Sequence, residues 1–188
     1  MYRIALLALL VPSALRLCAT TVTFTAGCTS GEAGITSTIT FDGAVATDPA
    51  GHATYTGAQF NNGTNPCGSD FLGISSSTTT ILFDQPIDYF GFAWGTPDPN
   101  NNVEFFNGAT SLFLFSGATA APTYVNVFAG AGEQFTRIVF SYEGCCFETD
   151  NHSYRLAPGA TLVPEPSSLS VALLGLGFLA WQLHLKKR

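Results

Sequence analysis

Positive charge is nearly absent from the middle of this 188-residue chain. Of the 7 Lys and Arg residues, only Arg137 and Arg155 lie between residues 20 and 163, whereas 12 of the 13 Asp and Glu residues lie there. Two cations against twelve carboxylates give the segment a net charge of −10. Proteins bind nucleic acid and anionic membrane surfaces through Lys and Arg. We therefore expect neither partner, while cations, neutral glycans and basic proteins stay compatible with this charge.

Catalytic motifs are also missing. The sequence has no Gly-x-Ser-x-Gly elbow, no His-Glu-x-x-His motif and no phosphate-binding loop. Cys146 with His152 is a conceivable nucleophile and base, and Glu148 with Asp150 a conceivable carboxylate pair. However, paired cysteines outside the cell are mostly structural, and carboxylates two residues apart are equally typical of a solvated strand edge. We predict that the protein is not an enzyme, with a surface hydrolase as an alternative.

A long helical period is absent as well. Short runs of Phe, Thr, Val, Ile and Tyr alternate instead with Gly, Asn, Asp, Pro and Ser, at the spacing of a β-sandwich. The expected strands are 21–25, 37–41, 78–83, 87–94, 103–106, 111–115, 124–128, 137–142 and 153–156. Asn107-Gly108 predicts a hairpin, and the stretch 96–102, rich in Pro and Asn, predicts a surface loop. The fold class we predict is all-β, an antiparallel, jelly-roll-like β-sandwich.

The N-terminus has the composition of an export signal. A basic residue precedes an apolar stretch, Ile4 to Val11, and Leu17-Cys18-Ala19 provides a cleavage site. We interpret residues 1–19 as a secretory signal peptide. The alternatives are a lipoprotein cysteine at Cys18 and an apolar strand or helix of the mature domain.

The C-terminus combines three features in a fixed order. These are the motif Val163-Pro164-Glu165-Pro166, a run without charge from Ser167 to Leu185, and the basic cluster Lys186-Lys187-Arg188. A helix of roughly 19 residues at about 1.5 Å per residue nearly crosses a hydrocarbon core of about 30 Å. The basic cluster predicts a cytoplasmic end, and the prolines bias the motif toward an extended conformation. We therefore predict a single transmembrane helix preceded by a stiff, exposed peptide; a permanent anchor and a buried core helix are the alternatives.

Together, the motif, the glycine-bearing run and the basic tail resemble the PEP-CTERM sorting signal of bacterial exosortase-dependent surface proteins. The resemblance implies that exosortase, a membrane-embedded cysteine protease-transpeptidase, recognises Pro164-Glu165-Pro166, removes the tail and releases or re-anchors the remainder. It divides the chain into a signal peptide (1–19), a β-sandwich ectodomain (20–162) and a sorting signal (163–188).

A second resemblance covers residues 78–154. The stretches that carry it are 83–95, 97–99, 103–108, 124–128, 135–140 and 147–151. They resemble the ectodomain of one group of exosortase-dependent proteins. This implies a jelly-roll-like sandwich similar to lectin-type and carbohydrate-binding modules, and it names no ligand.

Four cysteines remain after the signal peptide: Cys28, Cys67, Cys145 and Cys146. An even number in an exported chain predicts disulfides rather than metal ligands. Adjacent cysteines in a strand point to opposite faces, so bonding both to Cys28 and Cys67 needs partners on two sides of a sheet. The other solution joins Cys28 to Cys67 and leaves a vicinal Cys145–Cys146 bridge of uncommon geometry. We favour Cys28–Cys67, and both solutions remain open.

Two kinds of ligand are considered for the domain. We expect no cofactor, with calcium as the alternative, because the loop 98–104 together with Glu148, Asp150 and Asn151 supplies the oxygen atoms that calcium prefers. Glycan binding is the other, through stacking on Trp94, Tyr89 or Tyr142, although the apolar run around Trp94 favours a place in the core.

These observations predict an exported bacterial cell-surface or extracellular-matrix protein with a structural or adhesive role. It begins as an inner-membrane-anchored precursor, and exosortase is its processing partner. Extracellular polysaccharide is a further candidate partner. A calcium-assisted carbohydrate-binding module and a surface hydrolase are the alternative functions.

Overall fold

The computed structural model describes residues 19–61, 66–75, 78–117, 123–142, 144 and 147–159, and these form eleven β-strands and no helix. The strands are β1 Thr21–Thr25, β2 Ser37–Ile39, β3 Ala53–Thr56, β4 Gln59–Asn61, β5 Phe71–Ile74, β6 Thr78–Trp94, β7 Asn101–Asn107, β8 Thr110–Ser116, β9 Thr123–Phe128, β10 Phe135–Tyr142 and β11 Phe147–Leu156. All their pairings are antiparallel. The predicted all-β, antiparallel class is therefore confirmed.

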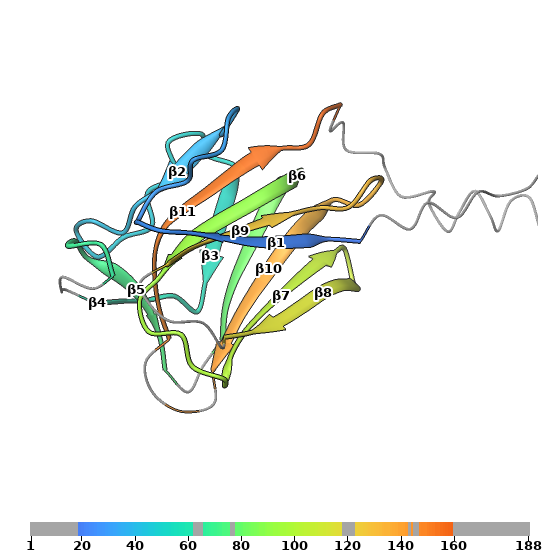
Figure 1. The fold of residues 1–188 in the computed structure, drawn as a ribbon. Helices are drawn as coiled ribbons and strands as arrows, with labels where there is room; N and C mark the ends of the chain where they lie inside the picture. Colours follow the sequence, from blue (N-terminus) through green and yellow to red (C-terminus); the bar gives the residue numbers. More distant parts are fainter. Residues whose placement is uncertain are drawn as a thin grey trace, which may run out of the picture. The chain divides into compact units, whose positions relative to one another are not determined.

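The strand β6 organises the sheet because it pairs with four others (Figure 1). Its first part, Thr78–Phe83, lies between β3 and β10. Its second part, Ile87–Trp94, lies between β9 and β11. Both the β10 and the β11 ladders shift register next to Ile87, which follows Pro86. Proline has no backbone N–H to donate to a neighbouring strand. The two shifts of register therefore occur beside the residue that cannot continue regular strand pairing.

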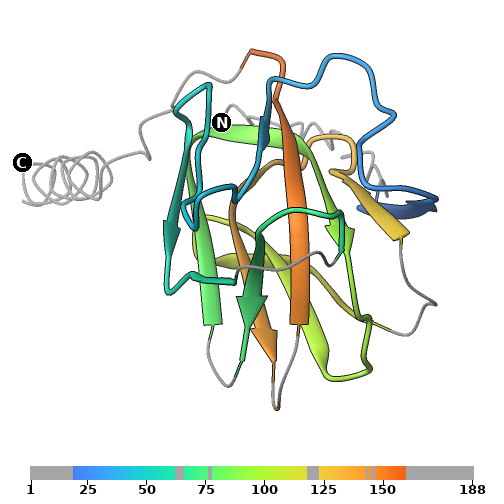
Figure 2. The same ribbon diagram turned by 90° about the vertical axis from the view of Figure 1, so that its left-hand side faces the viewer.

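The hydrogen-bonded sheet runs in the order β4-β5-β11-β6-β10-β7-β8, with β1 joined to it through β9. The sheet is curled, as the two ribbon views show (Figures 1 and 2), and its buried apolar side chains form one core cluster. Aromatic rings from different strands pack together inside the curl. Between ring centroids, Phe90 lies 6.2 Å from Phe105 of β7, and Phe92 lies 5.2 Å from Phe140 of β10. Residues on the two parts of the curl thus share a single core.

The expected strands overlap the observed ones along most of the chain, and the structure differs from the expectation in three respects. The strand expected over 153–156 is longer, since β11 begins at Phe147. The runs 78–83 and 87–94 form one strand, β6, instead of two. The strands β3, β4 and β5 were not expected. They have three or four residues each and contain Ala, Gln, Asn and Gly, which have low β-propensity. Pairing with longer neighbours, rather than local composition, accounts for these strands.

The hairpin expected at Asn107-Gly108 joins β7 to β8, and Gly108 has a positive φ of 57°. The loop expected over 96–102 is shorter than predicted, because Asn101 and Asn102 already belong to β7. Asn101 is fully buried. Its Nδ2 donates to the carbonyl of Thr96 at 2.9 Å, and its backbone N–H donates to that of Asp98 at 3.0 Å. A polar side chain here closes its own turn instead of facing solvent.

Cys28 and Cys67 form a disulfide, with their Cα atoms 5.7 Å apart. The favoured pairing is thus confirmed for this bond. Cys145 and Cys146 lie outside the described residues, so the vicinal bridge remains a prediction. The signal peptide up to Cys18 and the transmembrane helix expected after Pro166 lie outside them too. Every described strand and every core residue falls between Thr20 and Ala157.

Candidate functional site

The residues predicted for sorting lie outside the part of the chain that the structure describes, which ends at Gly159. They are Val163, Pro164, Glu165, Pro166, Lys186, Lys187 and Arg188. Within the described residues, no helix has the length and apolarity needed to cross a bilayer. The described residues therefore belong to the domain that precedes the motif.

His152 lies in the centre of the core, with no exposed surface. Its Nδ1 is 2.9 Å from the hydroxyl of Tyr55, and its Nε2 is 2.9 Å from Oγ1 of Thr149. The ring stacks on Phe140 at 5.3 Å between centroids. Burial lowers the pKa of His152 to about 3, so the imidazole is neutral at pH 7. Both ring nitrogens are engaged inside the core, an arrangement that stabilises the fold and leaves neither nitrogen open to a substrate.

Asp150, two residues before His152, is also buried. Its carboxylate accepts hydrogen bonds from the backbone N–H of Asn151 at 2.7 Å and from Oγ of Ser69 at 2.9 Å. Burial raises the pKa of Asp150, and the nearby carboxylates of Asp42 and Asp70 raise it further against the effect of those hydrogen bonds. The ionised side chain is therefore a cost to the folded state at neutral pH.

Asp150→Asn is expected to raise the free energy of unfolding at pH 7 by roughly 1 kcal/mol. An amide keeps the bond from Asn151 and can donate to Ser69, while it removes a buried charge. Because the folded-state pKa is raised, the gain should shrink as the pH falls and Asp150 itself becomes protonated. Urea unfolding at pH 7 and pH 4 measures both quantities. A loss of stability at pH 7 would show that the negative charge is needed.

Three of the carboxylates considered for calcium have hydrogen-bond partners or positions of their own. Glu148 accepts a hydrogen bond from Oγ1 of Thr96 at 3.1 Å, Glu104 accepts one from Oγ of Ser111, and Asp150 lies in its own buried position. Among the described residues, no group of three or more His, Cys, Asp or Glu side chains is arranged to hold a metal ion. The carboxylates of Glu148, Glu104 and Asp150 therefore each have separate hydrogen-bond partners.

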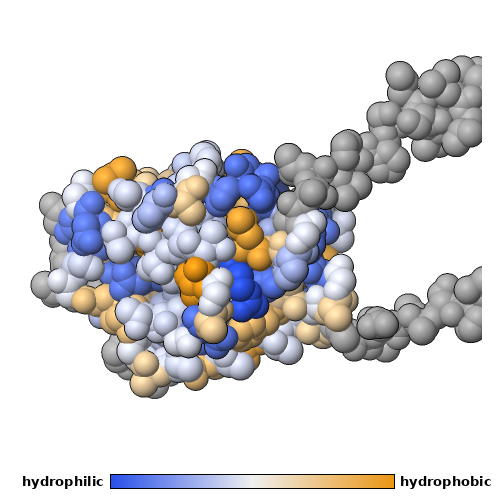
Figure 3. Space-filling model, turned by 90° about the horizontal axis from the view of Figure 1, so that it is seen from above, coloured by the Kyte–Doolittle hydropathy of each residue, from blue (hydrophilic) through white to orange (hydrophobic). Residues whose placement is uncertain are grey.

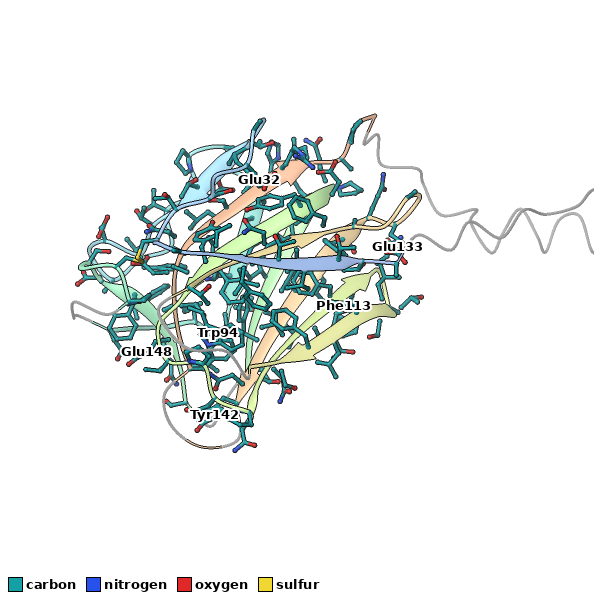
Figure 4. The ribbon with its side chains drawn as sticks, viewed as in Figure 1. Glu32, Trp94, Phe113, Glu133, Tyr142 and Glu148 are labelled. Carbon is teal, nitrogen blue, oxygen red and sulfur yellow. A yellow bond between two sulfur atoms is a disulfide. The ribbon has the colours of Figure 1, made fainter. Side chains whose placement is uncertain are left out.

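Two of the three aromatic residues considered for glycan stacking are inaccessible. Trp94 points into the interior of the sheet (Figure 4) and contacts Phe92, Phe115 and Phe147. Its Nε1 is buried without a hydrogen-bond partner. Tyr89 is fully buried as well, and only Tyr142 is partly exposed. The expectation that Trp94 belongs to the core is confirmed, and Tyr89 and Trp94 are excluded as stacking platforms.

Tyr89 is buried because the N-terminal segment 26–34 covers the outer side of β6 and β11. Its hydroxyl donates to Oδ1 of Asn126 at 2.8 Å and lies 2.7 Å from Oγ of Ser30. Nδ2 of Asn151 donates to the carbonyl of Cys28 at 2.9 Å. Position 91 requires glycine, because a Cβ there would lie 2.3 Å from the hydroxyl oxygen of Tyr89. The segment held by the disulfide thus closes this side of the sheet.

Within the part of the chain that the structure describes, no segment covers a different outer surface. We call it the open face, defined as the outward side chains of β3, the first part of β6, β10, β7 and β8. Leu82 and Leu114 on this face are 45% and 55% exposed. Arg137 lies at its centre, with the guanidinium carbon 3.9 Å from the centroid of the Phe106 ring. The sequence did not predict this face, although buried and outward side chains alternate in 78–83 and 137–140.

A pocket of about 470 Å3 opens beside β3 and the turn that follows it. Its lining is mainly apolar: Val45, Ala46, Ala53, Thr54, Tyr55, Gly57, Ala58 and Phe60. No charged side chain lines it. Figure 3 shows one side of the domain, on which apolar residues form separate patches among polar ones.

Comparison with known proteins identifies the C-terminal segment. The family model of the PEP-CTERM protein-sorting motif matches residues 162–188. No curated protein and no solved structure matches the chain. The chain therefore carries a PEP-CTERM sorting motif directly after the β-rich domain, and such a motif implies exosortase-dependent sorting of a secreted precursor to the cell surface.

Proposed function

We propose that the protein is a structural or adhesive component of the bacterial cell surface or extracellular matrix, delivered there by exosortase. The match of residues 162–188 to the sorting motif is the observation that carries this proposal. In it, exosortase recognises Pro164-Glu165-Pro166 and removes the apolar run with Lys186, Lys187 and Arg188. Before this step the apolar run anchors the precursor in the inner membrane.

The domain that precedes the motif supports a role outside the cytoplasm. It has a disulfide between Cys28 and Cys67, and such bonds persist in oxidising compartments. The composition of residues 20–163, with only two cations, suits a soluble, non-membrane surface. Its buried histidine and separate carboxylates favour a binding or structural role over catalysis.

The finer architecture belongs to the same proposal. Ring contacts between Phe92 and Phe140, and between Phe90 and Phe105, pack two parts of the curled sheet against each other. This arrangement supports a jelly-roll-like sandwich, in which β6 passes from one layer to the other at Pro86. Rigid sandwiches of this kind present broad sheet faces as binding surfaces.

Processing is tested by mass spectrometry of the mature protein from the native host, with and without its exosortase. The host with exosortase should yield a chain that ends at or near the motif, whereas the deletion strain should retain Lys186, Lys187 and Arg188. Glu165→Gln should reduce processing, and Ser168→Ala, two residues beyond the motif, is the matched control. An intact basic tail in both strains would overturn the proposal.

A further inference from the structure

We propose that the open face binds a neutral polysaccharide, with Arg137 at the centre of the site. This inference deepens the adhesive role under Proposed function and rests on it, but it concerns residues that take no part in sorting. The expected partner is a chain of sugar rings whose hydroxyl groups carry no net charge.

The open face is a regular array of outward side chains. The registers place Leu82 opposite Arg137 on one side and Phe106 opposite it on the other. The next row places Thr80, Val139 and Glu104 side by side. Five strands at about 4.8 Å spacing make the face about 19 Å wide. An extended chain therefore has room to lie across several strands at once.

The face offers both kinds of contact that a sugar ring requires. The Arg137 guanidinium lies on the Phe106 ring, which fixes a planar group with several N–H donors at a partly exposed position. Thr80 and other hydroxyl groups donate and accept, and the Glu104 carboxylate accepts. The exposed side chains of Leu82 and Leu114 contact the C–H surfaces of the rings. Donors, acceptors and apolar atoms thus alternate over short distances, as they do on a polysaccharide.

Arg137 is available to a ligand. The other arginine of the domain, Arg155, is paired with Asp88 at 2.8 Å. Within the described residues, Arg137 forms no ion pair. Its Nε is buried without a hydrogen-bond acceptor, so only the outer end of the guanidinium can face a ligand. Stacking on Phe106 therefore positions the guanidinium without engaging its terminal N–H groups. Arg137 is thus a partly exposed cation held by packing on an aromatic ring rather than by an ion pair.

The charge of the domain selects the neutral class of polysaccharide. Residues 20–163 carry a net charge of −10, and Glu104 lies diagonally across the ladder from Arg137. A polymer with one carboxylate per sugar would be repelled by both. Neutral hydroxyl groups bind without this penalty and without the salt dependence of a charged ligand.

The test is affinity electrophoresis of residues 20–159, which contain all described strands and the core, in gels with dextran, xylan or alginate. Retardation by a neutral polymer that persists in 0.5 M NaCl is expected. Arg137→Gln and Leu82→Ser should each weaken binding about tenfold, which corresponds to about 1.4 kcal/mol. Arg155→Gln is the matched control, since it removes the same charge away from the face. Melting temperatures of all variants verify that they are folded.

Three results would overturn the inference: no retardation by either neutral polymer, retardation by alginate alone, or unchanged binding in both open-face variants. These results are independent of the tail. If the host protein is processed normally and the domain binds no neutral polymer, sorting stands and the polysaccharide site fails. If the domain binds and the tail stays intact in both strains, the site stands and exosortase-dependent delivery fails.

Discussion

Lowering the pH from 7 to 3 is expected to remove about 4 kcal/mol from the free energy of unfolding through one side chain, His152. Burial lowers its pKa to about 3 in the folded state, against about 6.5 in the unfolded chain. Between these values the unfolded chain binds a proton that the folded core excludes, so acid favours unfolding. At about 1.4 kcal/mol per pH unit, the effect begins near pH 6.5 and is complete near pH 3.

His152→Gln isolates this contribution. The amide of Gln can bond to the Tyr55 hydroxyl or to Thr149 Oγ1, the two partners of the imidazole, but it does not titrate. The variant should be less stable at pH 7 and should show a much flatter slope between pH 6.5 and pH 4 in urea unfolding. His52→Gln, which removes a partly exposed imidazole outside the core, is the matched control.

Asp48 adds to the acid sensitivity at lower pH, whereas the raised pKa of Asp150 acts in the opposite direction. Burial acts to raise the pKa of Asp48, but hydrogen bonds from Ser37, Ala53, Tyr154 and Ala50 outweigh it and lower the value below 3.8. Its stabilising effect is therefore present above about pH 3.8 and is lost as the pH falls further. A wild-type slope confined to pH values below 4 would assign the acid sensitivity to carboxylates and contradict the role of His152.

Removing the Cys28–Cys67 bond is expected to lower the free energy of unfolding by about 4 kcal/mol. The cysteines are 39 residues apart, and opening a loop of this size restores conformational freedom to the unfolded chain. The bond also holds the segment 26–34, whose Ser30 and Cys28 contact Tyr89 and Asn151. Denaturant unfolding of Cys28→Ser/Cys67→Ser measures the loss.

Cys145→Ser/Cys146→Ser is the matched control for the disulfide. It removes the same number of thiols and should leave the Cys28–Cys67 peptide intact in a non-reducing map. Dithiothreitol should destabilise this control about as much as it destabilises the wild-type chain. A map that links Cys145 to Cys28 would contradict the observed pairing.

The composition of most longer strands was sufficient to predict them, although only residues 153–156 of β11 were expected. The runs around Val125, Phe140 and Phe105 have β-branched and aromatic residues at alternate positions, and each one is a strand. Strand β6 was expected as two, because Pro86 interrupts the pattern. β3 and β5 depend on neighbours distant in sequence, such as β6 for β3. Such pairing energy comes from tertiary contacts, which local propensity does not contain.

The candidate sites were predicted less completely than the strands. The sorting motif is local, so its residues were recognisable in order. The burial of Tyr89 depends on a segment some 60 residues earlier in the chain, brought there by Cys28. The open face needs the registers of three strands, β6, β10 and β7, before Leu82, Arg137 and Phe106 become neighbours. No spacing rule in the sequence gives that adjacency.

The central position of β6 has a consequence for when the chain can fold. Its partners include β3, from residue 53, and β11, which ends at residue 156, so its pairing is complete only when nearly the whole domain is present. Contacts this distant in sequence make folding slow. A precursor that crosses a membrane as an extended polypeptide benefits from such a delay, because the domain cannot acquire its final structure until β11 has emerged.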